Sequence, residues 1–361
     1  MWKTTEVTRR LGLSVPIVQG PFGGGLSTVE LTSIVSNAGG LGSFGVNNLA
    51  PGQIGTVVAN LRQRTDKPFA VNLWVTNHDA DGLHLPREDF VRNAARMKPY
   101  FDELGLPLPE YPERFGQVFE EQVGALLEAA PPVFSFIFGV PSPAILAECR
   151  ARGIATIGTA TTVAEAVVLD EAGVDAIVAT GFEAGGHRVS FLKSAEASLT
   201  GTFALIPQVA DRVKAPVIAA GGIADGRGIA AALALGASAV QIGTAFLACD
   251  ESGTSDLHRA KLHASEPGGT QLTRVLTGRL VRALSNRLID ELTPLTHELP
   301  PYPSQGWFVA QLKAAALAQG RSDLLSMLAG QASPLVRHTS ADALMKALVA
   351  ETDEVLAKLG T

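Results

Sequence analysis

The sequence has few cysteines, few charged residues and no basic clusters, and each of these scarcities excludes a class of protein. Its two cysteines, Cys149 and Cys249, cannot build the disulfide framework of a small secreted domain, so a cytoplasmic location is predicted. Charged residues make up only 18% of the chain, the net charge is −6, and no run of lysine and arginine reaches four. We therefore expect no nucleic-acid partner.

A long uncharged stretch runs from residue 228 to residue 249, which is long enough for a membrane span. Glycine and polar residues interrupt it, among them Gly236, Ser238 and Gln241. This pattern favours a buried helix, a tight turn and a buried strand, so we expect no membrane segment.

Apolar runs rich in valine, isoleucine and phenylalanine recur along the chain, and most are continuous rather than alternating, as in parallel strands covered on both faces. Amphipathic or alanine-rich segments separate the runs, which predicts an α/β fold, the (β/α)8 or TIM barrel. An open doubly wound sheet is the alternative, weakened because no G-x-G-x-x-G follows the first run. The expected strands are residues 16–20, 40–45, 69–75, 133–139, 154–159, 176–181, 216–222 and 239–246.

Two regions do not follow the alternation of strands and helices. Residues 76–124 are rich in proline and charge and too long for a loop in a compact barrel, and residues 251–361 are mostly helical in pattern. We expect these two regions to form one helical subdomain, a substrate or lid subdomain over the C-terminal mouth. The barrel would then comprise residues 1–75 and 125–250.

The C-terminal ends of the strands should carry the active site of such a barrel. Glycine dominates those ends, which suits a large flat or phosphorylated ligand that approaches the backbone closely. Gly221-Gly222 and Gly243-Thr244 close the last two strands, where backbone N–H groups commonly bind phosphate. The alternative is turn chemistry without a ligand.

Two amides interrupt otherwise apolar strands near their C-terminal ends, Asn72 and Gln241. A buried amide without a hydrogen bond costs about 1–3 kcal/mol, so each needs a partner. That partner is either a neighbouring strand or water, or the polar edge of a bound cofactor.

The segment GFEAGGHRVSF, residues 181–191, places His187 directly after Gly185 and Gly186 at the end of the sixth strand. An imidazole with an ordinary pKa near 6.5 would serve as a base or as a donor to an anionic substrate. The alternative is a loop histidine in water. We expect His187 to be the catalytic residue.

Three further side chains have less specific patterns. Arg188 either holds an anionic substrate or pairs with a helix, Glu183 orients its loop, and Tyr302 either reaches the substrate or is an exposed aromatic beside prolines. No metal site is expected, because the remaining histidines lack metal-binding spacing. These are His78, His84, His258, His263, His297 and His338.

The segment GFEAGGHR, followed by AAGGIADGRGIAAALALGASAVQIGTAFL, resembles the nitronate monooxygenase family, also called 2-nitropropane dioxygenases. The resemblance covers nearly the whole chain, from VQGPFGGG, FAVNLWV and VFSFIFGVPSP to PPYPSQGWFVAQLKAAALAQGRSDLLSMLAGQ. It implies an FMN-dependent barrel with a helical substrate domain. The implied reaction is oxidation of alkyl nitronates by O2 to carbonyl compounds and nitrite, with neutral nitroalkanes left open.

The resemblance also implies roles for residues. His187 is the expected active-site histidine. Arg188 and Tyr302 stay candidate substrate contacts on their own patterns alone. Two positions depart from the family: Thr180 stands where glutamine is usual, and Val189 where glycine is common. The expected FMN-binding residues are Gln19, Gly20, Pro21, Phe22, Asn72, Thr180, Gly185, Gly186, Gly221, Gly222, Gln241, Ile242, Gly243 and Thr244.

Other functions on the same fold remain open. An FMN-dependent NAD(P)H reductase of the enoyl-acyl-carrier-protein or quinone type is the main alternative. A protein resembling IMP dehydrogenase is disfavoured, because the loop after the sixth strand has no cysteine. A flavin-binding protein without turnover is the third.

Overall fold

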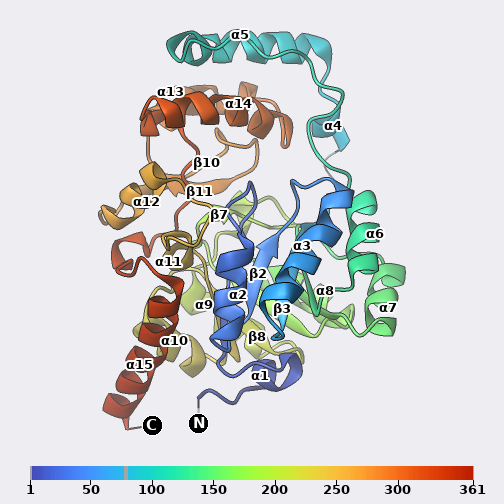
Figure 1. The fold of residues 1–361 in the computed structure, drawn as a ribbon, viewed down its shortest axis with the longest axis vertical. Coiled ribbons are helices and arrows are strands. Elements are labelled where there is room, and N and C mark those ends of the chain that lie inside the picture. Colours follow the sequence, from blue (N-terminus) through green and yellow to red (C-terminus); the bar gives the residue numbers. More distant parts are fainter. Residues whose placement is uncertain (1, 77–79, 361) are drawn as a thin grey trace.

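The computed structural model describes residues 2–76 and 80–360, and a closed barrel of eight parallel strands lies at its centre (Figure 1). The strands follow the order β1-β9-β8-β6-β5-β4-β3-β2, and a parallel bridge between Val18 and Leu41 closes the ring. All eight predicted strands are confirmed, and the open sheet is excluded. Their bounds are β1 Ile17–Gln19, β2 Gly42–Gly45, β3 Phe69–Trp74, β4 Val133–Ile137, β5 Ala155–Ala160, β6 Ala176–Thr180, β8 Val217–Ala220 and β9 Ala239–Ile242.

Side chains fill the barrel rather than leave a pore. Val18, Ala70, Val133, Ile157, Val178 and Ile218 belong to one buried cluster, joined by Val7 and Leu11 of α1 (Glu6–Leu11). A ring of helices packs on the outside of the strands. These are α2 Val29–Asn37, α3 Pro51–Arg64, α6 Phe119–Ala129, α7 Pro143–Ala151, α8 Val163–Glu171, α9 Thr202–Ala210, α10 Gly226–Ala234 and α15 Ala341–Leu359.

The two predicted insertions meet above one end of the barrel, where α5 (Arg87–Glu103), α13 (Arg287–Leu292) and α14 (Ser304–Ala318) lie together in Figure 1. Phe90 of α5 contacts the rings of Trp307 and Phe308 in α14, with centroids 6.1 and 5.0 Å apart. Arg287 forms an ion pair with Glu103 between α13 and α5. Two shorter helices, α4 (Ala80–Leu83) and α12 (Asp256–His263), complete these regions, and α11 (Thr244–Leu247) follows β9 in the barrel.

The C-terminal region is mostly helical, as its pattern predicts, but it also contains two strands that were not expected. A three-stranded antiparallel sheet joins β10 (Thr270–Thr273), β11 (Val281–Leu284) and β7 (Gly186–His187). The two strands in this region are four residues each, and β11 pairs with the distant β7, so neither leaves a strong local signal in the sequence.

Two helices at the expected domain boundaries pack on the barrel. α15 lies against α10 and α2, as the eighth outer helix, although residues 243–340 separate it from the last strand. α6 packs on α3 and β3. We therefore propose that the subdomain comprises residues 76–118 and 251–340, with α6 and α15 assigned to the barrel.

The uncharged stretch 228–249 forms most of α10, a turn and β9, as predicted, but the strand ends at Ile242 rather than Phe246. Residues Thr244–Leu247 instead form the helix α11, which begins directly after Gly243. Within residues 2–76 and 80–360, the structure has no helix with the length and apolar character that a bilayer span requires. Cys149 and Cys249 are both buried and unpaired with each other.

Candidate functional site

A cavity of about 700 Å³ opens at the C-terminal ends of the barrel strands, beneath the subdomain. Strand ends form its floor, with Asn72, Thr159, Thr180 and Gln241 among them. Residues of the subdomain, such as Tyr302, form the opposite wall. Of the expected cofactor-binding residues, all line this cavity except Gln19 and Ile242, which are fully buried beside it.

The glycine loops after β8 and β9 face the cavity together. Gly221 and Gly222 have φ angles of +102° and +73°, a left-handed region that favours glycine. Gly243 is the N-cap residue of α11. Gly20 donates its N–H to Ile242 O at 2.8 Å, which connects the ends of the first and last strands. Glycine loops of this kind can bring backbone N–H groups close to an anion.

A segment near the C-terminus completes this rim and was not expected from the sequence. Gly330 donates its N–H to Thr244 Oγ1 at 2.9 Å. A Cβ added to Gly185 would lie 2.5 Å from the Gly330 nitrogen, so the glycine pair before His187 serves the approach of this segment. Close packing of protein against protein therefore accounts for Gly185, in addition to any approach of a ligand.

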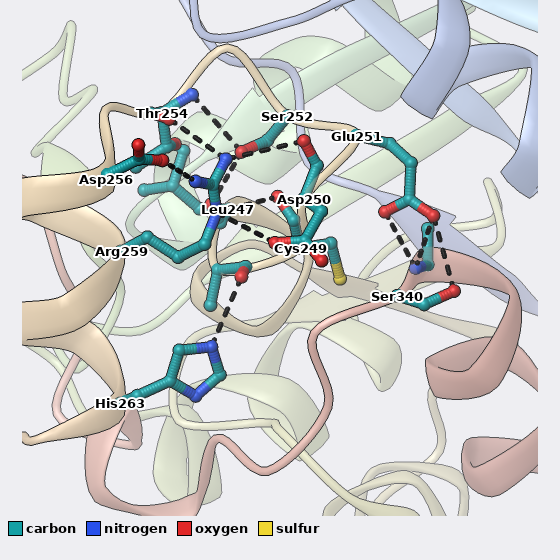
Figure 2. A network of polar contacts seen from close by, with 12 residues as sticks. Leu247, Cys249, Asp250, Glu251, Ser252, Thr254, Asp256, Arg259, His263 and Ser340 are labelled. Atoms are coloured by element: carbon teal, nitrogen blue, oxygen red, sulfur yellow. Dashed lines mark hydrogen bonds and ion pairs between the residues drawn. The ribbon is translucent and has the colours of Figure 1, made fainter.

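A polar network fixes the loop that follows α11 (Figure 2). Arg259 of α12 donates to Thr254 O at 3.0 Å and to Asp256 at 2.7 Å, and reaches carbonyl oxygens of the same loop. The Glu251 carboxylate accepts the Ala341 N–H at 3.0 Å, at the start of α15. The β9 side of the cradle is thereby anchored to both the subdomain and the barrel.

The two amides behave differently. Asn72 Nδ2 donates to Ser135 Oγ on β4 at 3.0 Å, the neighbouring-strand partner considered from sequence, while the side chain also lines the cavity. Gln241 lines the cavity and is only partly buried.

Gln19, an expected cofactor-binding residue, makes a contact within the barrel. It accepts the Ser43 N–H at 2.9 Å, so this glutamine connects β1 to β2. Gln19 therefore has a structural role.

His187 faces the cavity from β7, in a wall of aromatic rings. Its ring centroid lies 4.8 Å from that of Trp74, 5.9 Å from Tyr302 and 6.0 Å from Phe138. These edge contacts orient the imidazole and limit its contact with water. Trp74 follows Asn72 by two residues on β3, so strand periodicity could have identified it.

Thr277 of the subdomain holds the imidazole by a hydrogen bond. Its Oγ1 lies 3.0 Å from His187 Nε2 and 3.2 Å from Arg279 O, and it accepts the Arg279 N–H at 3.3 Å. If the single hydroxyl proton goes to Arg279 O, Nε2 of His187 carries the donated proton and Nδ1 is an acceptor.

The charge state of His187 differs from the sequence expectation of an ordinary imidazole. Burial, and after it the positive charge of Arg279, lowers the pKa of His187 from 6.5 to about 3. The ring is therefore neutral at physiological pH. It can donate or accept a hydrogen bond but brings no positive charge of its own.

Arg188 does not line the cavity, so the expected substrate contact lacks a geometric basis. The side chain is 2% exposed, and its guanidinium donates to Gly181 O at 2.7 Å, Thr180 O at 3.2 Å and Ser198 O at 3.1 Å. Arg188 thus secures the loop that carries His187. Glu183 orients the same loop, as expected, by accepting the Thr202 N–H at 2.9 Å.

No cluster of three or more potential metal ligands occurs within residues 2–76 and 80–360, and His78 lies outside these residues.

Tyr302 reaches the cavity, with its ring 5.4 Å from that of Trp74. Thr277 and Arg279 were missed from the sequence, because they lie between two short strands that were not expected.

Comparison with known proteins decides the family. The family model for nitronate monooxygenase matches residues 5–351. The chain belongs to the nitronate monooxygenase family. It is therefore related to oxidoreductases, and the resemblance seen in the sequence is confirmed.

Individual relatives and solved structures are similar to nearly the whole chain. A probable nitronate monooxygenase of Staphylococcus saprophyticus is 38% identical, covering 98% of this chain and 99% of the relative. The solved structure of nitroalkane oxidase from Streptomyces ansochromogenes is 34% identical with a TM-score of 0.88, covering 98% of this chain and 100% of that one. FabK from Thermotoga maritima is 29% identical with a TM-score of 0.77, covering 99% and 98%.

Proposed function

We propose that this enzyme binds FMN and oxidises alkyl nitronates with O2 to carbonyl compounds and nitrite. The observation that carries the proposal is the position of the neutral His187 ring, inside an aromatic wall and across one cavity from a glycine cradle. The name of the family and the solved nitroalkane oxidase support the same substrate class.

The cavity suits FMN in its polar and apolar parts. The N–H groups of the Gly221-Gly222 and Gly243-Thr244 loops would hold the phosphate. Asn72 and Gln241 would meet the polar edge of the ring system or its ribityl chain. Thr180 also lines the floor, and its shorter side chain leaves more of that floor to the ligand than a glutamine would.

When bound, FMN supplies the redox chemistry that links the nitronate to O2. The protein positions the reactant and excludes water. With the Thr277 hydroxyl as the donor to Nε2, the proton of the neutral ring lies on Nδ1, and His187 would donate it in a hydrogen bond to the nitronate. Tyr302 and Trp74 would enclose the alkyl group. With a pKa near 3, His187 is a weak base in the free enzyme, which favours a substrate that has already lost its α-proton.

The test is anaerobic mixing of the FMN-loaded protein with an alkyl nitronate, or with NADH or NADPH, followed by flavin absorbance. Bleaching by the nitronate alone supports the proposal. Bleaching by the nicotinamide alone would assign the site to the reductase alternative and overturn it. His187→Asn should retain FMN while nitrite production falls; full activity in that variant would also contradict the proposal.

A further inference from the structure

The cavity at the mouth of the barrel carries little charge, and one of its charged side chains is unpaired. Among the described residues that line it, none is aspartate or glutamate, and the lysine and arginine side chains are Lys313 and Arg114. Arg114 forms an ion pair with Glu121 at 3.3 Å. The Lys313 side chain, on α14, makes no hydrogen bond or ion pair with any residue of 2–76 or 80–360. Its positive charge is therefore available to a ligand in this cavity.

α14 places Lys313 away from the aromatic wall around His187. Tyr302, which precedes the helix, has its ring centroid 5.9 Å from that of His187. Lys313 lies further along the helix than Ser304, the first residue of α14, by about 14 Å, because each helical residue adds about 1.5 Å. One face of the helix lines the cavity, with residues three or four positions apart: Gly306, Ala310, Lys313 and Leu317. Lys313 is therefore on the side of the cavity that is remote from the aromatic wall.

The neighbours of Lys313 connect it to the glycine loop after β9. His258 of α12 lines the same cavity, and burial is the main cause that lowers its pKa to about 4, with the charge of Lys313 acting in the same direction. His258 Nε2 donates to Leu328 O at 3.1 Å, and two residues later Gly330 donates its N–H to Thr244 Oγ1 at 2.9 Å. Lys313, His258 and the loop that carries Thr244 thus belong to one region of the cavity.

The phosphate of FMN suits this region. It carries about two negative charges at neutral pH, and it lies at the opposite end of the ribityl chain from the ring system. A ring beside His187 therefore places the phosphate away from the aromatic wall. Backbone N–H groups of the glycine loops can donate hydrogen bonds to it but supply no full charge. A lysine ammonium supplies that charge, and its flexible stem lets it reach inward from the exposed surface of α14.

We propose that Lys313 is a further cofactor-binding residue, whose ammonium pairs with the phosphate of FMN and selects the phosphorylated flavin over riboflavin. The glycine loops Gly221-Gly222 and Gly243-Thr244 contact the same phosphate through their backbone. The inference rests on the proposed function, because it concerns the cofactor of that reaction. A neutral side chain at position 313 weakens the binding of FMN and leaves that of riboflavin unchanged, since riboflavin has no phosphate.

The experiment measures the dissociation constants of FMN and of riboflavin for the full-length protein after its flavin has been removed, by flavin fluorescence at low and high salt. Lys313→Met removes the charge and keeps a long side chain, and Lys313→Arg keeps the charge. Lys214→Met is the control, because it removes an exposed lysine that precedes β8 and lies outside the cavity lining. We expect Lys313→Met to weaken FMN binding about tenfold at low salt and less at high salt, with riboflavin unaffected. Lys313→Arg should retain most of the FMN affinity.

The same ratio of FMN to riboflavin affinity in Lys313→Met and Lys214→Met would overturn the inference. An equal loss of affinity for both flavins in Lys313→Met would also overturn it, because that result assigns the lysine to packing rather than to the phosphate. Failure of the proposed function is distinguishable: a wild-type protein that binds FMN and oxidises no nitronate contradicts the reaction, while the two flavin affinities still test Lys313. A wild-type protein that binds no FMN contradicts both.

Discussion

The Nε2 atom of His187 lies 3.0 Å from Oγ1 of Thr277, and this contact joins the barrel rim to the subdomain. His187 lies on β7, whose partner in the small sheet is β11 of the subdomain. The orientation of the proposed catalytic ring therefore depends on a residue that the barrel does not contain. A barrel without residues 251–340 would retain much of the cradle and lose this control.

Thr277→Val tests that dependence. The variant keeps the shape of the side chain and removes the hydroxyl, so the His187 imidazole loses the only hydrogen bond that the structure records for it among the described residues. We expect about tenfold lower kcat for nitronate oxidation and a stability loss of about 1 kcal/mol. Thr273→Val is the control, because it removes a hydroxyl that accepts the Val275 N–H in the same subdomain and lies outside the cavity lining. Equal loss of kcat in both variants would refute a specific role for Thr277.

Gly222→Ala tests the cradle. Gly222 has a φ of +73°, and Gly268 has a φ of +80° on a loop with no atom within 4 Å of an added Cβ. Each alanine should cost about 1 kcal/mol of unfolding free energy, because both positions are left-handed. FMN affinity should fall about tenfold in Gly222→Ala alone, as the N–H groups turn away from the phosphate. Fluorescence titration of FMN measures the difference, and equal affinities would count against the cradle.

Arg188→Met distinguishes a structural from a substrate-binding arginine. Removing the guanidinium leaves three buried carbonyl oxygens without this donor, so unfolding free energy should fall by about 3 kcal/mol. KM for the nitronate should be unchanged in the folded variant. Denaturant unfolding and steady-state kinetics report the two effects. A raised KM with unchanged stability would restore the substrate contact expected from the sequence.

Acid should destabilise the protein before most carboxylates titrate. Burial lowers the pKa of His187 to about 3 and that of His258 to about 4, whereas an unfolded histidine titrates near 6.5. Below pH 6.5 the histidines bind protons in the unfolded chain but not in the folded chain. The free energy of unfolding therefore decreases as the pH is lowered from 6.5 to the folded pKa values. Each histidine contributes up to about 1.4 kcal/mol per pH unit. Urea unfolding between pH 7.5 and 4.5 should show a shallower slope in His187→Asn; an unchanged slope would contradict the low pKa.

The sequence predicted the barrel well, because each strand is a continuous apolar run whose character does not depend on distant partners. It also predicted that two glycine-containing ends would lie side by side, since Gly221-Gly222 ends the seventh apolar run and Gly243-Thr244 lies within the eighth, and these residues do line one cavity. These features are local, and a local pattern is visible along the chain.

The rest of the site depends on contacts that no local pattern encodes. The pKa of His187 follows from rings supplied by β3 and the subdomain, so an ordinary value was the natural expectation. Arg188 was equally able to serve a substrate or the backbone until its burial was known. The approach of Gly330 to Gly185 joins residues that are far apart in the sequence.

The late position of α15 in the chain also affects synthesis. The seam between α10 and α2 stays uncovered until residues 341–359 have left the ribosome, long after the last strand is made. The side chains of Trp2 and Lys3 then donate hydrogen bonds to the Asp353 carboxylate of α15. These bonds connect the N-terminal residues to the last helix of the fold. A nascent chain that stalls before residue 341 would therefore expose the faces of α10 and α2 that α15 covers in the complete fold.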